Sequence, residues 1–300
     1  MNGELSQIIF YVEKNSKNAD IWAFRTKTQE YDGQIWFTYL YYEPIEEEQN
    51  PNILLKSILE NVKASVDEIL LISDFSPVIE EAVLNNIACA AYILNSGENH
   101  REKDFPYADY CLMDIGDMEV DVLNKIWQRQ RGIPWTILRT VRTLVREQIL
   151  SDIDDLYEMY QDPKTCKYME NLYEDRKMEE EYLKEYIDKQ YRFYEYGIWT
   201  IEDRTTGEYV GRAGISNREG YEEAELGYVI KESYRGKGYA KEVTKAIIDY
   251  AKEQLEMKDM IAFTLEENTA SVRLLKSLGF DFYKMDNIGG KAHAMYRKKL

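Results

Sequence analysis

Short apolar runs along the first half of the chain alternate with longer segments in which apolar residues recur every three or four positions. The short runs predict strands, at Gln7–Val12, Ile35–Tyr42, Ile69–Ile72, Cys89–Leu94 and Tyr107–Met113. The longer segments predict helices, at Asn52–Ser65, Pro77–Asn86 and Met118–Gln130. Because strands that alternate with helices build parallel sheets, we expect an α/β module with helices over its sheet.

The second half shows a different order of patterns. Strands are expected at Thr136–Val141, Ile198–Glu202, Glu208–Ile215, Ala224–Ile230, Met260–Leu265, Phe282–Met285 and Ala292–Lys298. Helices are expected at Ser151–Tyr160, Met178–Tyr196, Gly236–Gln254 and Asn268–Leu278. The polar turn Asp203–Gly207 joins two of the strands and predicts a β-hairpin. This half should therefore be α+β, with a mixed, mostly antiparallel sheet flanked by helices.

Gly132 and Pro134 end the helical pattern before them and mark the best domain boundary. A length of 300 residues fits two domains, each large enough for its own core. We expect one domain in residues 1–133 and another in residues 134–300.

The formal net charge is −17, and 44% of the residues are hydrophobic. The chain is thus too apolar to be disordered, and its charge argues against electrostatic binding to nucleic acid or to an anionic membrane. No apolar stretch approaches the roughly 18 residues of a membrane span. Cys89, Cys111 and Cys166 have no Cys-x-x-Cys pairing, and there are two histidines. We therefore expect reduced thiols in a cytoplasmic protein without a metal site.

One segment carries candidate chemistry. The strand Ala224–Ile230 is followed by Arg235-Gly-Lys-Gly-Tyr-Ala240, which opens a long helix. A helix N-terminus offers unpaired backbone N–H groups, and the two glycines let an anion approach the main chain closely. Arg235 and Lys237 add positive charge, so the segment predicts a pyrophosphate site. It matches neither a Walker A loop nor the Gly-x-Gly-x-x-Gly of dinucleotide-binding domains.

Arg-Gly-Lys-Gly-Tyr-Ala resembles the Arg/Gln-x-x-Gly-x-Gly/Ala signature of the GNAT superfamily of acetyl-CoA-dependent N-acetyltransferases. Asn268-Thr-Ala-Ser271, followed by a helix that ends in Leu-Gly279-Phe280, resembles the next helix of that superfamily. The resemblance covers roughly residues 135–300 and implies the GNAT fold, acetyl-CoA as cofactor with CoA as product, and an amine as substrate.

The resemblance also implies site residues. Main-chain groups of Val229 and Ile230 would pair with the pantetheine arm, and Asn268 and Ser271 would contact the cofactor. The pyrophosphate would lie on a loop made of Arg235, Gly236, Lys237, Gly238, Tyr239 and Ala240.

An amine must lose a proton to attack a thioester, so a base is needed. Glu225 stands where many family members keep a glutamate that acts through water, and Glu222 and Glu223 are alternatives. Many members also have a tyrosine that protonates the leaving thiolate, but Leu275 occupies that position here. Tyr228 and Tyr239 are the candidates to replace it.

Two further features are open to a functional or a structural interpretation. Cys166 and His293 could support nucleophilic acyl transfer, but nothing in the sequence brings them together. The helix Met178–Tyr196 falls where the GNAT fold places its acceptor groove. Its acids, including Glu181 and Glu185, could attract a cationic amine or form a solvated face.

The segment Leu70–Leu94 has a faint resemblance to the late part of haloacid dehalogenase-like phosphatases, with Asp74 in an acidic loop after a strand. The nucleophilic Asp-x-Asp signature of that family is absent from residues 1–60. We therefore interpret residues 1–133 as a Rossmann-like module without catalysis of its own, for substrate recognition or dimerisation.

The leading hypothesis is an N-acetyltransferase that acts on a protein N-terminus or a small amine. The alternative is a catalytically inactive CoA-binding or scaffold protein whose first domain binds a partner. A bifunctional phosphatase–acetyltransferase is a third hypothesis, and a homodimer stays open.

Overall fold

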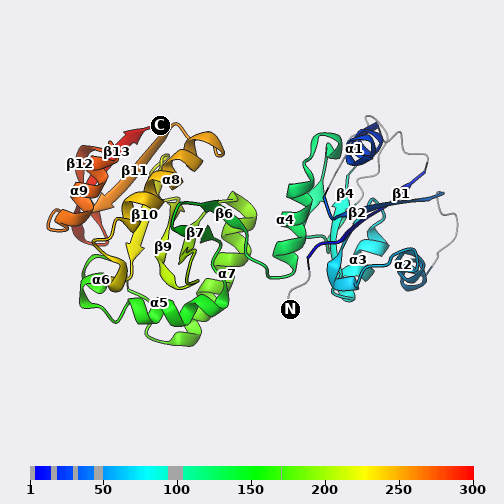
Figure 1. Ribbon diagram of the computed structural model, residues 1–300, viewed down its shortest axis with the longest axis horizontal. Helices are drawn as coiled ribbons and strands as arrows, with labels where there is room; N and C mark the ends of the chain where they lie inside the picture. The colour runs from blue at the N-terminus through cyan, green and yellow to red at the C-terminus, as the bar shows by residue number, and fades with distance from the viewer. Residues whose placement is uncertain (1–3, 15–18, 30–32, 44–49, 94–103, 170) are drawn as a thin grey trace. The chain divides into compact units, whose positions relative to one another are not determined.

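The computed structural model describes residues 4–14, 19–29, 33–43, 50–93, 104–169 and 171–300. Contacts between Cα atoms divide the chain into two units, Met1–Ile133 and Pro134–Leu300. Each unit has its own sheet and its own apolar core (Figure 1).

The unit Met1–Ile133 is built on a five-stranded parallel sheet in the order β2-β1-β3-β4-β5. Its strands are β1 (Gln7–Glu13), β2 (Trp36–Tyr42), β3 (Ile69–Ser73), β4 (Ala88–Tyr92) and β5 (Cys111–Leu112). Its helices are α1 (Ala19–Gln29), α2 (Pro51–Leu59), α3 (Ser76–Leu84) and α4 (Val120–Gln130).

Successive side chains of the central strands pack against different helices. Ile8 and Phe10 of β1 share a core with α1 and α4, whereas Ile9 shares another with α2 and α3. Both faces of the sheet are thus buried, which explains why its strands are nearly continuous apolar runs. The expected parallel sheet with helices over it is present. Its order, 2-1-3-4-5, is that of flavodoxin-like sheets and differs from the 3-2-1-4-5-6 order of Rossmann dinucleotide-binding domains.

Several expected elements of this unit differ from the structure. Helix α1 is not predicted by the sequence pattern, because its apolar residues do not form one stripe: Ile21 and Phe24 are buried, but Trp22 is exposed. The strand expected over Tyr107–Met113 shrinks to Cys111–Leu112, which pair with β4. Leu94, at the end of another expected strand, lies outside the described residues.

The unit Pro134–Leu300 contains an eight-stranded sheet in the order β12-β13-β11-β10-β9-β8-β7-β6. Its strands are β6 (Thr136–Arg139), β7 (Thr143–Arg146), β8 (Ile198–Asp203), β9 (Tyr209–Ser216), β10 (Ala224–Ile230), β11 (Asp259–Thr264), β12 (Asp281–Ile288) and β13 (Lys291–Lys299). Its helices are α5 (Ile153–Met159), α6 (Pro163–Tyr168), α7 (Arg176–Tyr194), α8 (Tyr239–Glu253) and α9 (Thr269–Ser277). The mixed, mostly antiparallel sheet expected from the sequence is confirmed, since β10 and β11 are its parallel pair.

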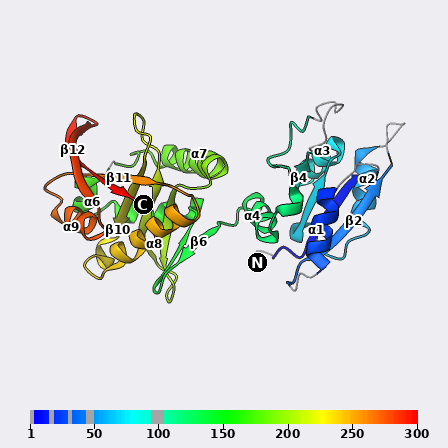
Figure 2. The ribbon, with the colours of Figure 1, turned by 90° about the horizontal axis from the view of Figure 1, so that it is seen from above.

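Helices cover both faces of this sheet, and Figure 2 shows α7 and α8 on opposite sides of it. Val243 and Ile247 of α8 and Leu275 of α9 pack into the main core. Leu156 and Met159 of α5 form a second cluster with Val229 of β10. Strand β10 is therefore held between helices on its two faces.

The strand expected over Thr136–Val141 is wrong in extent. Strand β6 ends at Arg139, and the chain turns back into β7. The Thr143 N–H donates to Thr140 Oγ1, and the Thr140 N–H donates to the Thr143 carbonyl, which closes the turn. A local hydrogen bond from a backbone N–H to a threonine side chain thus ends a strand that the apolar pattern would continue.

Candidate functional site

Strands β10 and β11 lie side by side at their start and separate toward their carboxyl ends. The register pairs Ala224 with Met260 and Glu225 with Ile261, and the pairing stops there. The β11-facing backbone edge of β10 is consequently without a strand partner from Leu226 to Ile230. An extended ligand with amide groups could pair with this edge as a strand would. Val229 and Ile230, expected to pair with a pantetheine arm, lie on this open part.

The loop between β10 and α8 exposes consecutive backbone N–H groups. Gly236 and Gly238 have φ values of 72° and 86°, a left-handed conformation that glycine adopts without strain. Gly238 is the N-cap of α8 and carries no capping side chain. The N–H groups of residues 236–241 find no acceptor among the described residues. Such a run at a helix N-terminus fits a diphosphate, whose oxygens accept hydrogen bonds and carry negative charge.

Arg235 begins this loop, but its guanidinium points back into the protein. It donates to the Ile230 carbonyl at 2.8 Å, to the Asp162 carboxylate at 2.5 Å and to Thr165 Oγ1 at 2.6 Å. Arg235 thereby ties the loop to the start of α6. The Lys237 ammonium lies 5.6 Å from the centre of the Tyr234 ring, and the Lys237 side chain is exposed.

Ser271 contacts strand β10, and Asn268 caps the helix that carries Ser271. Asn268 is the N-cap of α9, and its side-chain oxygen accepts the Ser271 N–H at 3.2 Å. The Ser271 hydroxyl lies 2.7 Å from the hydroxyl of Tyr228, on β10. Burial raises the pKa of Tyr228 to about 12, so its phenol keeps its proton at neutral pH.

The three candidate bases have different surroundings. Glu225, on β10, accepts from the Arg218 Nε at its Oε2 at 2.5 Å, while its Oε1 has no partner among the described residues. Glu223 forms an ion pair with Arg297 at 3.0 Å, and Glu222 is exposed. Only one oxygen of Glu225 is thus engaged, and the other can hold a water.

Leu275 and Tyr239 are taken up by other roles. Leu275 is fully buried in the main core, as an apolar residue at that position of α9 should be. The Tyr239 hydroxyl donates to Asp203 at 2.7 Å, and this hydrogen bond raises the pKa of Tyr239. Of the two tyrosines named from the sequence, Tyr228 is therefore the one beside Ser271.

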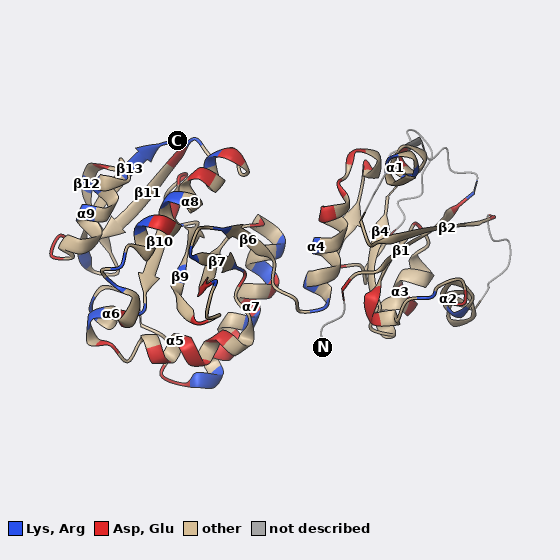
Figure 3. Cartoon of the chain, in the orientation of Figure 1, with Lys and Arg blue, Asp and Glu red and all other residues tan. Residues whose placement is uncertain are grey.

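The remaining candidates give no second site. Cys166 lies on α6 and His293 on β13, and no hydrogen bond joins them. Acidic positions mark α5 and α7 in Figure 3. Glu181 is exposed, and the pKa of Glu185 is lowered by its ion pair with Lys189. Within the described ranges, no group of three or more His, Cys, Asp or Glu side chains could hold a metal ion.

Two residues of this site were not found by the sequence reasoning. Asp162 holds Arg235 although 73 positions separate them, and Arg218 reaches Glu225 from the loop between β9 and β10. Neither belongs to a motif, so only the fold reveals them.

Among the helices that the structure describes, none is long and apolar enough to cross a membrane.

Known proteins with similar sequences match about half of this chain. Residues 142–281 match the family described as acetyltransferase (GNAT) domain. An uncharacterized N-acetyltransferase of Bacillus licheniformis, p20, is 31% identical over 147 residues, which are 48% of this chain and 81% of the relative. The uncharacterized protein YkkB of Bacillus subtilis is 28% identical over 143 residues, 47% of this chain and 82% of the relative.

Among solved structures, an acetyltransferase from Agrobacterium tumefaciens is 24% identical and covers 54% of this chain and 92% of its own, with a TM-score of 0.47. The resemblance stated from the sequence is confirmed for residues 142–281, and the match to p20 includes most of that relative. The chain belongs to the GNAT acetyltransferase family.

Proposed function

We propose that residues 134–300 form an N-acetyltransferase domain that moves an acetyl group from acetyl-CoA to a primary amine, with residues 1–133 as an accessory α/β domain. The observation that carries the proposal is the run of N–H groups over residues 236–241 beside the open edge of β10. The first would bind the diphosphate and the second the pantetheine amides. Both features lie within the residues that match the family.

The reaction needs one new bond and one broken bond. The amine nitrogen attacks the acetyl carbonyl carbon, and the carbon–sulfur bond to CoA breaks. A water on Glu225 Oε1 carries the amine proton to the carboxylate. The Arg218 side chain holds the other oxygen and so fixes the direction of the carboxylate. The Tyr228 hydroxyl, in contact with Ser271, donates a proton to the departing thiolate, and the proton that Glu225 took from the amine passes to solvent, from which Tyr228 is reprotonated.

Steady-state acetylation of a panel of amines tests this proposal. The panel contains peptides with free N-termini, polyamines and small amines, and we expect at least one to be acetylated. Glu225→Gln should lower kcat by about 100-fold, because a general base contributes at least that much, while calorimetry shows an unchanged Kd for CoA.

Glu223→Gln is the matched control, since Glu223 precedes the same strand and pairs with Arg297 instead. It should keep wild-type kcat. If folded wild-type protein bound no CoA, the proposal would fail. If Glu225→Gln retained full kcat, the assignment of Glu225 as the base would fail.

The cytoplasmic location, the homodimer and the resemblance of the first unit to dehalogenase-like phosphatases stay predictions from the sequence.

A further inference from the structure

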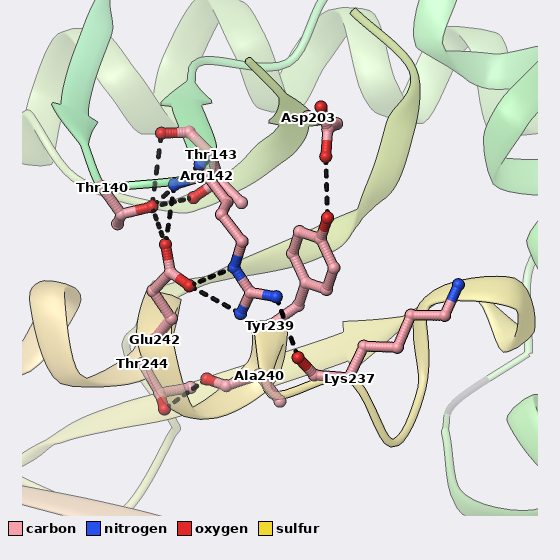
Figure 4. A network of polar contacts seen from close by, with 9 residues as sticks. All are labelled: Thr140, Arg142, Thr143, Asp203, Lys237, Tyr239, Ala240, Glu242 and Thr244. Carbon is pink, nitrogen blue, oxygen red and sulfur yellow. Dashed lines mark hydrogen bonds and ion pairs between the residues drawn. The ribbon is translucent and has the colours of Figure 1, made fainter. Parts of the chain in front are cut away.

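Arg142, on the turn between β6 and β7, lies beneath the loop that begins α8. Its Nη1 donates to the main-chain carbonyl of Lys237 at 2.9 Å, and its Nε donates to the Glu242 carboxylate at 2.7 Å. Its guanidinium carbon stands 4.1 Å from the centre of the Tyr239 ring. One side chain thus contacts the loop, the first turn of α8 and the aromatic residue between them (Figure 4).

Glu242 orients this guanidinium from the helix side. Its Oε1 accepts the Thr140 hydroxyl at 2.6 Å and the Arg142 backbone N–H at 2.9 Å, and its Oε2 accepts the guanidinium. Although burial opposes it, these hydrogen bonds lower the pKa of Glu242. Three hydrogen bonds from one turn therefore fasten the turn between β6 and β7 to the first turn of α8 (Figure 4).

The contact with the Lys237 carbonyl has a direct consequence for anion binding. The peptide bonds of the described chain are trans, so the carbonyl of Lys237 and the N–H of Gly238 point in opposite directions. When Arg142 holds the carbonyl inward, it turns the Gly238 N–H outward. A glycine-rich loop without this contact would rotate that peptide freely, and an outward carbonyl oxygen would repel a phosphate.

We propose that Arg142 is a positioning residue that fixes the loop over residues 236–241 in its anion-binding conformation. This inference rests on the proposed function, because it assigns the loop a diphosphate ligand. Arg142 touches the loop from behind and acts through the Lys237–Gly238 peptide, not through contact with the ligand. Its effect should therefore be confined to donors that carry a diphosphate.

Arg142→Gln and Arg142→Lys test the proposal, with Arg204→Gln as matched control. Arg204 donates from the neighbouring turn to the Thr140 carbonyl at 2.8 Å, but it does not touch the loop. Lysine keeps the charge but lacks the fork that serves Glu242 and Lys237 together, so both Arg142 variants should behave alike. Thermal unfolding identifies any variant that has lost its fold.

Two measurements separate positioning from a general loss of structure. Calorimetry should show that Arg142→Gln weakens CoA by about 10- to 100-fold, the usual size of a lost hydrogen bond to a charged group. The kcat/KM for S-acetylpantetheine, which lacks the diphosphate, should stay within about twofold of wild type. Equal losses for both donors would overturn the proposal.

Hydrogen exchange needs no ligand, and the Glu242 N–H reports on the loop because it donates to the Gly238 carbonyl at 3.1 Å. This amide should exchange faster in Arg142→Gln than in Arg204→Gln, because the loop and the first turn of α8 are released. Unchanged exchange would refute the positioning role even if CoA binding were weakened. If wild-type protein bound no CoA, the proposed function would fail, and the exchange rates would still decide whether Arg142 holds the loop.

Discussion

Two junctions in this molecule lead from a strand into a helix and differ in charge: one contains a carboxylate, and the other contains glycines and a lysine. In the first unit β3 leads into α3, and in the second unit β10 leads into α8. A helix N-terminus favours an anion in both cases. The β3–α3 junction contains its own anion, Asp74, whereas the β10–α8 junction contains two glycines and Lys237.

Asp74 is completely buried and hydrogen-bonded. Its Oδ1 accepts the Glu13 N–H at 3.2 Å and the Tyr42 hydroxyl at 3.0 Å. Burial, together with the charge of Asp74, raises the pKa of Tyr42, so the phenol remains a donor. The Asp74 carboxylate is therefore paired with β1 and β2, whereas the N–H groups of residues 236–241 have no acceptor among the described residues.

The largest expected effect comes from a side chain that blocks the N–H groups of the β10–α8 junction. Gly238→Val places a β-branched residue at a φ of 86°, which strains the loop and covers its N–H groups. CoA affinity, measured by calorimetry, should fall by about 100-fold or more.

Gly207→Val is the control for backbone strain, since Gly207 has a φ of 72° in the turn between β8 and β9. It should lower the melting temperature to a similar degree and leave CoA affinity unchanged. Equal losses of affinity in the two variants would mean that strain alone accounts for the effect.

Removing the Asp74 carboxylate from the β3–α3 junction should lower the stability of the first unit and leave CoA affinity unchanged. Asp74→Ala removes a fully buried acceptor of the Glu13 N–H and of the Tyr42 hydroxyl, both of which are half-buried donors. We expect a loss of about 2 kcal/mol in the free energy of unfolding of the first unit, measured in urea, with CoA affinity unchanged. A weakened affinity for CoA would show that the first unit takes part in cofactor binding.

The β10–α8 junction could be predicted from the sequence because its residues are adjacent in the chain. Arg235 to Ala240 form one short motif, and Asn268 and Ser271 form another. The strand predicted over Ala224–Ile230 coincides with β10, since its apolar residues face cores on both sides.

Residues that act across the fold could not be predicted in this way. Arg142 contacts the loop from 95 positions away, and its turn begins at Thr140, before the end of the strand expected over Thr136–Val141. Arg235 was expected to offer its charge to the ligand, but Asp162 and Thr165 bind its guanidinium. The partner of a long cationic side chain depends on which elements the topology brings near, and a single sequence does not contain that information.

The smallest expected effect concerns Glu242, which accepts a hydrogen bond from Arg142 beside the β10–α8 loop. The pKa of Glu242 is lowered by its hydrogen bonds to Thr140 and Arg142, against the effect of burial. A carboxylate of this kind stabilises the fold above its ordinary pKa of roughly 4.3, and the contribution is lost as pH falls through the lower, folded value. Glu242→Gln cannot titrate, so its stability should lie below wild type by about 1 kcal/mol at pH 7.

The difference between wild type and Glu242→Gln should narrow below pH 4, which urea unfolding at pH 7, 5 and 3.5 would show. Parallel stability curves at all three values would mean that Glu242 does not hold the turn between β6 and β7 through its charge. Urea unfolding of Asp74→Ala at the same three pH values distinguishes the contribution of the β3–α3 junction from that of the β10–α8 junction. The deficit of Asp74→Ala lies in the first unit and that of Glu242→Gln in the second, so a variant that combines the two should show each loss unchanged in its own unit, because their sites share no partner.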